Sequence, residues 1–324
     1  MRVMVTGATA PLGSAIVGAL LAEPEVELVL GVGTEHRGAP ISPRMVYLRA
    51  DLTHRREVHD LIHRAATAHA IDTVVHVGQH RNPHDDGTRV HAQSVDSVRA
   101  LVLACSEHAT IRRFVYRSFA NVYAQPHATT TLIDEDTPLE LDHRAPQWLR
   151  DRVEADLTVC GYRGGSLQIS VLRCAEVVAP DIGSQLWDYL SSRICFRPAG
   201  FDPMINVLAI EDAASAFVAA VRSSVSGVFN VCGAETLPLS RAISESNRTA
   251  IAIPGGLLAP LYGLRRAATG FEFRYDLNAR RFHLGSLLDG ARALGKLGYV
   301  PRTRVRWPRP WWRVLLERLA ETRA

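Results

Sequence analysis

Residues 2–13 of this 324-residue chain read RVMVTGATAPLG, and this stretch decides the fold. Arg2 to Thr6 is a short apolar run typical of a buried strand, and Ser14 to Ala22 places its apolar residues at helical spacing. Between them lies a turn of small residues. The N–H groups and the positive dipole end at the start of such a helix favour a bound phosphate, so the stretch predicts a pyrophosphate-binding turn.

The turn from Thr6 to Gly13 follows the pattern of pyrophosphate-binding turns only in part. Glycine is needed where the backbone turns tightly or touches the phosphate, and Gly7 and Gly13 meet this need. Ala10 occupies the middle glycine position, and Pro11 removes a backbone donor. A turn that binds and a turn inherited from a nucleotide-binding ancestor that no longer binds are both open. The residues expected at the phosphates are Gly7, Thr9, Ala10, Pro11, Leu12 and Gly13.

The rest of the chain alternates between strand-forming and helix-forming segments. Further strands are expected at residues 26–32, 46–49, 73–77, 113–117, 168–173 and 227–231. Helices are expected at residues 55–68, 90–108, 147–159 and 211–222. This alternation implies right-handed crossovers and a parallel sheet. No linker divides the chain, so we expect its second half to lie over the sheet of the first half.

Composition and charge exclude several classes of protein. Hydrophobic residues make up 47% and charged residues 22% of the chain, as in a globular protein, and a net charge of +4 is too small to indicate nucleic-acid binding. The 13 histidines and 5 cysteines show no metal-ligand spacing, so we expect no metal site and free thiols. The N-terminus begins directly with a strand, and no apolar run has the length of a membrane span. We therefore expect a cytoplasmic protein.

A series of segments, in one order along almost the whole chain, resembles the extended short-chain dehydrogenase/reductase family, the NAD-dependent epimerase/dehydratase group. They are VTGATAPLG at 5–13, RADLT at 49–53, TVVHVG at 73–78, RRFVYRSFANVYA at 112–124, LRCAEVVAP at 172–180, INVLAIEDAASAF at 205–217, GVFNVCG at 227–233 and LGSLLDGARALGKLGYVP at 284–301. The resemblance implies an α/β fold, a Rossmann-type doubly wound parallel sheet with a smaller C-terminal region that covers the substrate. It also implies NAD or NADP as cofactor.

The resemblance divides the chain into two parts. Residues 1–175 would form the Rossmann core, completed by later elements at about residues 200–232, and residues 176–324 would supply mostly the substrate region and a basic, Trp-rich tail. Family members act on nucleotide sugars, sterols, flavonoid-type alcohols or related carbonyl compounds. The chain resembles this family in its overall pattern, but it departs from it at the positions of the active site.

Cofactor-binding positions carry over from the family with one departure. Gly33 lies where the family usually has an acidic residue for the adenosine ribose, and Glu35 could replace that acid. His36 or Arg37 could instead meet the 2′-phosphate of NADP, so the choice between NAD and NADP is open. The other positions that match cofactor-binding residues of the family are Asp51, Leu52, Val77 and Gly78.

All three catalytic positions of the family are replaced. Phe119 lies where the family has Ser or Thr, Trp148 where it has Tyr, and Arg152 where it has Lys. The family's chemistry needs a phenol that exchanges a proton, whereas an indole N–H is no practical proton donor or acceptor and phenylalanine supplies no hydrogen bond. Arg152 could still hold ribose hydroxyls. We therefore expect a pseudoenzyme that binds a nucleotide or a partner, with Phe119 and Trp148 facing each other in a narrowed pocket.

Two alternatives to this interpretation stay open. The chain could be an NAD(P)-dependent oxidoreductase or epimerase with a relocated acid/base residue, for which the candidates are Tyr116, Tyr123, His76, His80 and Cys174. Each of these has packing in the core or at its rim as the competing explanation. Arg117 and Arg152 could form an anion site where the triad was, or they could belong to ordinary ion pairs.

Two partner surfaces follow from the sequence. By analogy with the family, a homodimer would form through the helices at 90–108 and 147–159. In the tail, Trp307, Trp311 and Trp312 lie among arginines at 302, 304, 306, 309 and 313. Such a segment suits a membrane surface, the groove of a protein partner, or packing on the protein's own body. No nucleic-acid partner is expected.

Overall fold

The computed structural model describes residues 1–35, 42–124, 132–270, 272–284 and 287–308. At its centre is a seven-stranded sheet in which every neighbouring pair of strands is parallel. The strands, in spatial order, are β11 (Gly227–Val231), β7 (Gln168–Cys174), β5 (Arg113–Phe119), β4 (Thr73–His76), β1 (Arg2–Thr6), β2 (Leu28–Gly33) and β3 (Met45–Arg49). This is the strand order of a doubly wound Rossmann sheet, so the predicted fold class is confirmed.

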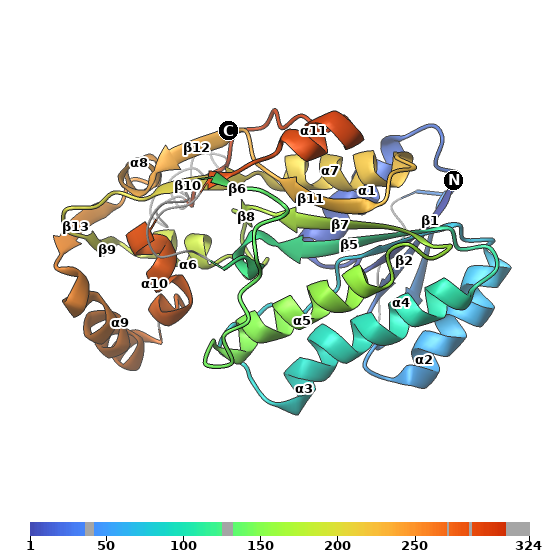
Figure 1. The fold of residues 1–324 in the computed structure, drawn as a ribbon, viewed down its shortest axis with the longest axis horizontal. Helices are drawn as coiled ribbons and strands as arrows, with labels where there is room; N and C mark the ends of the chain where they lie inside the picture. Colours follow the sequence, from blue (N-terminus) through green and yellow to red (C-terminus); the bar gives the residue numbers. More distant parts are fainter. Residues whose placement is uncertain (36–41, 125–131, 271, 285–286, 309–324) are drawn as a thin grey trace, which may run out of the picture.

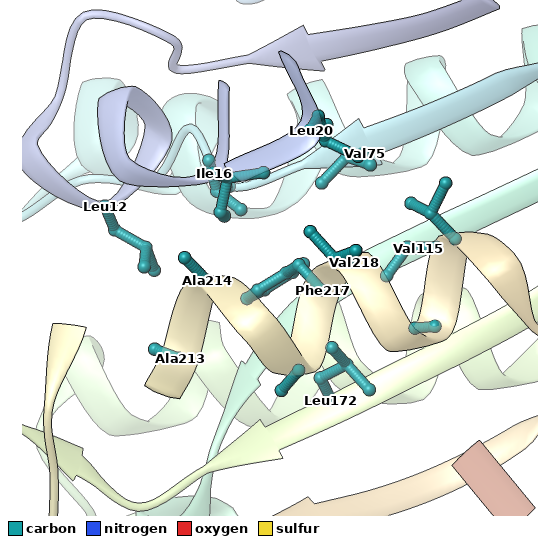
Figure 2. Packing of buried hydrophobic residues seen from close by; sticks show 14 of the residues in the cluster. Leu12, Ile16, Leu20, Val75, Val115, Leu172, Ala213, Ala214, Phe217 and Val218 are labelled. Carbon is teal, nitrogen blue, oxygen red and sulfur yellow. The ribbon is translucent and has the colours of Figure 1, made fainter. Parts of the chain in front are cut away.

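Helices cover both faces of the sheet (Figure 1). One face carries α1 (Pro11–Ala22), α7 (Ile210–Arg222) and α11 (Ala291–Leu297), and the other carries α2 (Arg55–Asp60), α4 (Ser97–Glu107) and α5 (Gln147–Gly161). Figure 2 shows Leu12, Ile16 and Leu20 of α1 meeting Phe217 of α7 above the sheet, and Phe217 is fully buried. Helices at this spacing bury the hydrophobic strands from both sides.

The long helices differ in detail from their predicted ranges. The segment predicted as one helix at 90–108 consists of α3 (Thr88–His91), a wider π-helical turn at Ala92–Asp96, and α4. The helix α2 likewise runs into a π-helical turn at Leu61–Ala66. On the face of the sheet that carries α4 and α5, Leu103 of α4 and Leu157 of α5 are exposed to solvent. The homodimer expected through these helices stays a prediction.

The C-terminal elements build a smaller unit at one end of the sheet (Figure 1). Its strands are β6 (Leu132–Ile133), β8 (Glu176–Val177), β9 (Ile194–Pro198), β10 (Met204–Leu208), β12 (Glu235–Pro238), β13 (Thr249–Ile253) and β14 (Leu287–Leu288). Its helices are α6 (Gln185–Ser191), α8 (Leu239–Glu245), α9 (Gly255–Thr269) and α10 (Tyr275–Leu284). A separate core rich in aromatic residues, among them Tyr189, Tyr262, Phe273 and Phe282, holds this unit together.

Three further observations bear on the sequence-based expectations. All five cysteines are free thiols. Among the described residues no group of three or more His, Cys, Asp or Glu side chains is arranged to hold a metal ion. In the same part of the chain, every helix is too short or too polar to cross a membrane.

Candidate functional site

A cleft of about 440 Å³ opens at the carboxyl ends of β1, β2 and β4, where the strand order of the sheet reverses. Ligands of open α/β sheets bind at this position. Of the residues predicted to bind a cofactor, those that line the cleft are Gly7, Thr9, Ala10, Pro11, Leu12, Gly13, Gly33, Asp51, Leu52, Val77 and Gly78. The structure therefore brings together side chains from four separate segments of the sequence.

The glycine turn has no room for a larger residue at either Gly7 or Gly13. Gly7 has a φ of +72°, and a Cβ on it would lie 2.7 Å from the Cα of Gly78. A Cβ on Gly13 would lie only 2.0 Å from the carbonyl oxygen of Gly7. The backbone segments thus approach as closely as a phosphate-binding turn requires.

The two departures of the turn, Ala10 and Pro11, fit the observed geometry. The helix α1 begins at Pro11, three residues earlier than the apolar spacing indicated, with Ala10 as its N-cap residue. Proline in the first turn removes an N–H that has no partner inside the helix, and its fixed φ suits that position. Pro11 therefore starts the helix instead of weakening it.

Glu35, the residue that could replace the family's acidic residue, lines the cleft. It lies in the loop after β2, where the Thr9 hydroxyl donates to its carboxylate and the Tyr47 hydroxyl donates to its backbone oxygen over 2.9 Å. The hydrogen bond from Thr9 holds the pKa of Glu35 below its ordinary value. A Cβ on Gly33 would lie 2.8 Å from both the Glu35 carboxylate and the Tyr47 hydroxyl, so the glycine leaves space for this arrangement. His36 and Arg37 lie outside the described residues.

The far wall of the cleft comes from the loop after β4, of which the sequence analysis named only Val77, Gly78 and His80. Its lining residues are Gln79, His80, Arg81 and Asn82, joined by Gln93 and Ser97. The two ring nitrogens of His80 lie 2.9 Å from the Gln93 amide oxygen and 2.9 Å from the Asp85 carboxylate. These residues carry no motif, and only the fold places them opposite the glycine turn.

A second, smaller cavity of about 80 Å³ lies between the end of β5, the start of α5 and the C-terminal unit. This inner cavity is lined by Phe119, Trp148 and Arg152, the residues predicted at the three catalytic positions. Arg117 and Ile182 line both the inner cavity and the cleft, so the two spaces are neighbours. Arg152 lines the inner cavity and not the cleft, which differs from its predicted role in cofactor binding.

The residues predicted at the three catalytic positions form one packed group, which we call the aromatic–arginine cluster (Phe119, Trp148 and Arg152). The guanidinium carbon of Arg152 lies 3.3 Å from the centre of the Trp148 ring and 3.5 Å from the centre of the Phe119 ring. Cation–π attraction of this kind is worth about 0.5–2 kcal/mol. Arg152 thus occupies the space between two rings that were expected to face each other directly. No group of this cluster exchanges a proton near neutral pH.

Ser118 does not line the inner cavity, because successive residues of β5 point to opposite faces of the sheet and Arg117 and Phe119 line it instead. Its hydroxyl donates to the fully buried carboxylate of Asp156, which also accepts hydrogen bonds from Arg173 over 2.7 Å and 3.0 Å. The structure shows that Asp156 pairs with a buried arginine and anchors the strand next to Phe119.

Residues proposed as relocated acid/base groups are mostly inside the protein. The Tyr123 hydroxyl donates to Asn230 over 2.6 Å, and Gln79 donates to the Tyr116 hydroxyl over 2.7 Å. Burial raises the pKa of both tyrosines and lowers the pKa of His76 to about 4. Among the described residues, no tyrosine lines the cleft or the inner cavity. Cys174 lines the inner cavity, but burial raises its pKa to about 12.

The sheet order, the glycine turn and the cleft above it define a Rossmann-type α/β protein. The chain belongs to the NAD-dependent epimerase/dehydratase family, whose model matches residues 3–232. This confirms the resemblance seen in the sequence.

Individual relatives span almost the whole chain. A 3-diazoavenalumate denitrifying reductase of a Streptomyces species is 28% identical over 312 residues, covering 93% of this chain and 96% of that protein. An uncharacterized protein of Mycobacterium tuberculosis is 26% identical over 310 residues, covering 93% of this chain and 80% of that protein. The crystal structure of UDP-glucuronic acid 4-epimerase from Bacillus cereus, in complex with UDP-glucuronic acid and NAD, matches with a TM-score of 0.69 and 17% identity, covering 94% and 95% of the two chains.

Proposed function

We propose that this protein binds a nicotinamide dinucleotide in the cleft and acts through that binding, as a pseudoenzyme that lacks the family's proton transfer. The observation that carries the proposal is the aromatic–arginine cluster. It replaces all three catalytic side chains at once, while the glycine turn keeps the close backbone contacts that suit a pyrophosphate. Selective loss of the reacting groups beside a retained cleft is what a binding protein on this fold would show.

The residues of the cleft fit a dinucleotide. Gly7 and Gly13 leave the start of α1 open to a pyrophosphate, and the first N–H groups of a helix have no partner within it. Glu35 would accept hydrogen bonds from the hydroxyls of the adenosine ribose, and Asp51 and Leu52 would lie beside the adenine. The Bacillus cereus epimerase that shares the fold holds NAD. A bound nicotinamide would supply hydride chemistry. Among the described residues no tyrosine lines either cavity, and His80, the acid/base candidate that lines the cleft, already contacts Gln93 and Asp85.

Binding and turnover measured together test this proposal. NAD⁺, NADH, NADP⁺ and NADPH would be titrated calorimetrically, and UDP-glucose and UDP-glucuronic acid would be incubated with the protein and NAD⁺. We expect a micromolar dissociation constant for at least one dinucleotide, a raised melting temperature at saturation, and no epimer. Absence of binding at millimolar dinucleotide would remove the proposal, and formation of either epimer would remove its non-catalytic part.

A reductase is the second candidate, and the Streptomyces relative favours it. That relative's name describes reductive removal of nitrogen from a diazo compound. An acceptor that is already strongly electrophilic takes a hydride without a proton from a side chain, so the loss of the catalytic tyrosine position does not exclude such a reaction. The test is to mix the protein with an aryl diazo compound and NADH or NADPH and to follow the absorbance of the reduced cofactor at ~340 nm. Oxidation of the cofactor faster than in a protein-free control would favour the reductase.

Glu35 is expected to make the cleft prefer NAD over NADP. A carboxylate at this position accepts hydrogen bonds from ribose hydroxyls and repels a 2′-phosphate. Hydrogen bonds to charged groups contribute about 1.5–3 kcal/mol, so Glu35→Gln should weaken NAD binding and shift the ratio of the two affinities towards NADP by about tenfold or more. Calorimetric titration of both cofactors checks this. An unchanged ratio would assign the selectivity to other residues.

A further inference from the structure

Two arginines at the inner cavity lack the carboxylate partners that buried arginines normally have. Arg117 of β5 is only 6% exposed, and Arg152 of α5, which lines the same cavity, is partly buried. Among the described residues, neither guanidinium makes a hydrogen bond or an ion pair, and both instead lie over aromatic rings. Buried Arg173, by contrast, donates twice to Asp156. An unpaired buried charge is unfavourable, so a missing counter-charge is indicated.

Polar atoms around the two arginines are unpaired as well. The atoms that are buried without a hydrogen-bond partner in the described structure include Nε of Arg117, Nε1 of Trp148 and Oδ1 of Asn121. All three residues line the inner cavity, and the Trp148 side chain is only 7% exposed. An indole N–H and a guanidinium N–H can each donate a hydrogen bond but cannot accept one. Two of the three unpaired atoms therefore require an acceptor.

The charge balance of the cavity points the same way. Its charged lining residues are Arg117, Arg152, Arg281 and Glu176. Glu176 is already engaged, since one carboxylate oxygen lies 2.9 Å from Arg281 and the other accepts from Ser184 over 2.8 Å and from the Leu186 N–H over 3.2 Å. Arg281 therefore uses up the charge of Glu176, and two positive charges remain. Burial and the neighbouring Arg117 hold the pKa of Arg152 well below its ordinary value.

We infer that the inner cavity binds a small organic carboxylate, held between Arg117 and Arg152 with the Trp148 indole N–H as a further donor. The remaining walls are largely apolar and include Ile133, Val177 and Ile205, which suits the carbon skeleton of an organic acid better than a fully hydrated inorganic anion. The free oxygen of Asn121 suits a hydroxyl on the same ligand. A volume of about 80 Å³ limits that part of the ligand to a few heavy atoms.

This inference deepens the proposed function by naming a ligand class for the cavity beside the cleft, but it stands separately from dinucleotide binding. A protein that binds the acid without a dinucleotide supports the inference and contradicts the proposed function. A protein that binds only the dinucleotide does the reverse. The two results are distinguishable because each ligand is titrated alone and in the presence of the other.

Lactate and its neutral amide, lactamide, are matched probes for the cavity. At constant ionic strength, we expect lactate to bind with a dissociation constant on the order of 1 mM and lactamide to bind at least about tenfold more weakly, measured from chemical-shift changes of the tryptophan indole protons. Inorganic phosphate is the competing anion. The inference would be overturned if lactate and lactamide bound equally well or if phosphate bound more tightly than lactate. It would also be overturned if lactate did not bind at roughly 50 mM, which is about 50 times the expected dissociation constant.

Variants separate the cavity from non-specific charge effects. Arg117→Met and Arg152→Met should each weaken lactate binding by at least about tenfold, and Arg117→Lys should retain part of it. Trp148→Phe keeps a ring but removes the N–H donor, and it should weaken binding several-fold. Arg99→Met is the matched control, because Arg99 lies on the surface of α4 paired with Asp96 and Glu154.

Stability gives a second readout that does not depend on the ligand. Because Arg117→Met removes an unpaired buried cation, the ligand-free variant should melt no lower than the parent protein, and lactate should no longer raise its melting temperature. Wild-type lactate affinity in both methionine variants would overturn the inference. So would an equal loss of affinity in the Arg99→Met control.

Discussion

Replacing Gly13 with alanine is expected to weaken dinucleotide binding by at least about 100-fold, which corresponds to about 2.7 kcal/mol. The added Cβ would lie 2.0 Å from the carbonyl oxygen of Gly7, which is roughly 1 Å or more shorter than an ordinary van der Waals contact. The turn must therefore open by about that distance. Opening moves the N–H groups at the start of α1 away from the pyrophosphate. Calorimetric titration with NAD⁺ checks this, together with a thermal melt that shows the variant is folded.

Gly18→Ala is the matched control for this prediction. Gly18 lies in the same helix, it is exposed, and a Cβ on it would have nothing within 4 Å. Alanine at an exposed helix position stabilises a protein by about 0.5–1 kcal/mol relative to glycine, so the control should bind like the parent and melt slightly higher. Equal affinity of the Gly13→Ala variant and the Gly18→Ala variant would show that the turn does not hold the dinucleotide.

The sequence predicted the sheet well because its strands are encoded locally. The apolar runs at residues 2–6 and 227–231 match β1 and β11 to the residue, and the ends of the other predicted strands differ by a few residues at most. A run of apolar residues bounded by turns is sufficient to indicate a buried parallel strand. The small sheets of the C-terminal unit were not predicted, because their strands lack the continuous buried run of the central ones. The strand β13 is exposed at its first four residues, and β6 consists of two residues that pair with the distant β14.

The candidate site was predicted in part. Positions in the glycine turn follow from spacing within one segment, whereas those after β4 follow from the resemblance to the family. The structure places Gly7 against both Gly13 and Gly78. The position of Arg152 did not follow from spacing, because a long side chain selects its direction by the groups around it. Its guanidinium lies over two rings that come from β5 and from its own helix. The far wall of the cleft was predicted only at Val77, Gly78 and His80, because residues distant in the sequence, such as His80 and Gln93, meet only in the folded chain.

Asp156→Ala is expected to destabilise the protein by about 3–5 kcal/mol, the largest stability loss predicted for a single polar side chain here. Asp156 is fully buried and accepts from Arg173 and Ser118, so alanine would leave Arg173 charged and unpaired at 4% exposure. A loss of this size lowers the melting temperature of a 324-residue protein by roughly 4–7 °C. Thermal and urea unfolding of the parent and the variant measure it.

Asp96→Ala is the surface control for this prediction. Asp96 pairs with Arg99 over 3.1 Å, but both side chains are about half exposed, so its loss should change the free energy of unfolding by less than about 0.5–1 kcal/mol. A similar effect of the two replacements would mean that the buried pair contributes no more than a surface pair.

A double variant distinguishes loss of attraction from the burial of an unpaired charge. Asp156→Leu with Arg173→Met removes both charges and keeps apolar volume, so it should be markedly more stable than Asp156→Ala. If the double variant recovers most of the lost stability, the destabilisation comes from the stranded guanidinium of Arg173.

At the inner cavity, the same rule predicts a change in the free energy of unfolding of the opposite sign. Arg117 is stranded already in the parent protein, and removing it should therefore relieve the fold where removing Asp156 weakens it.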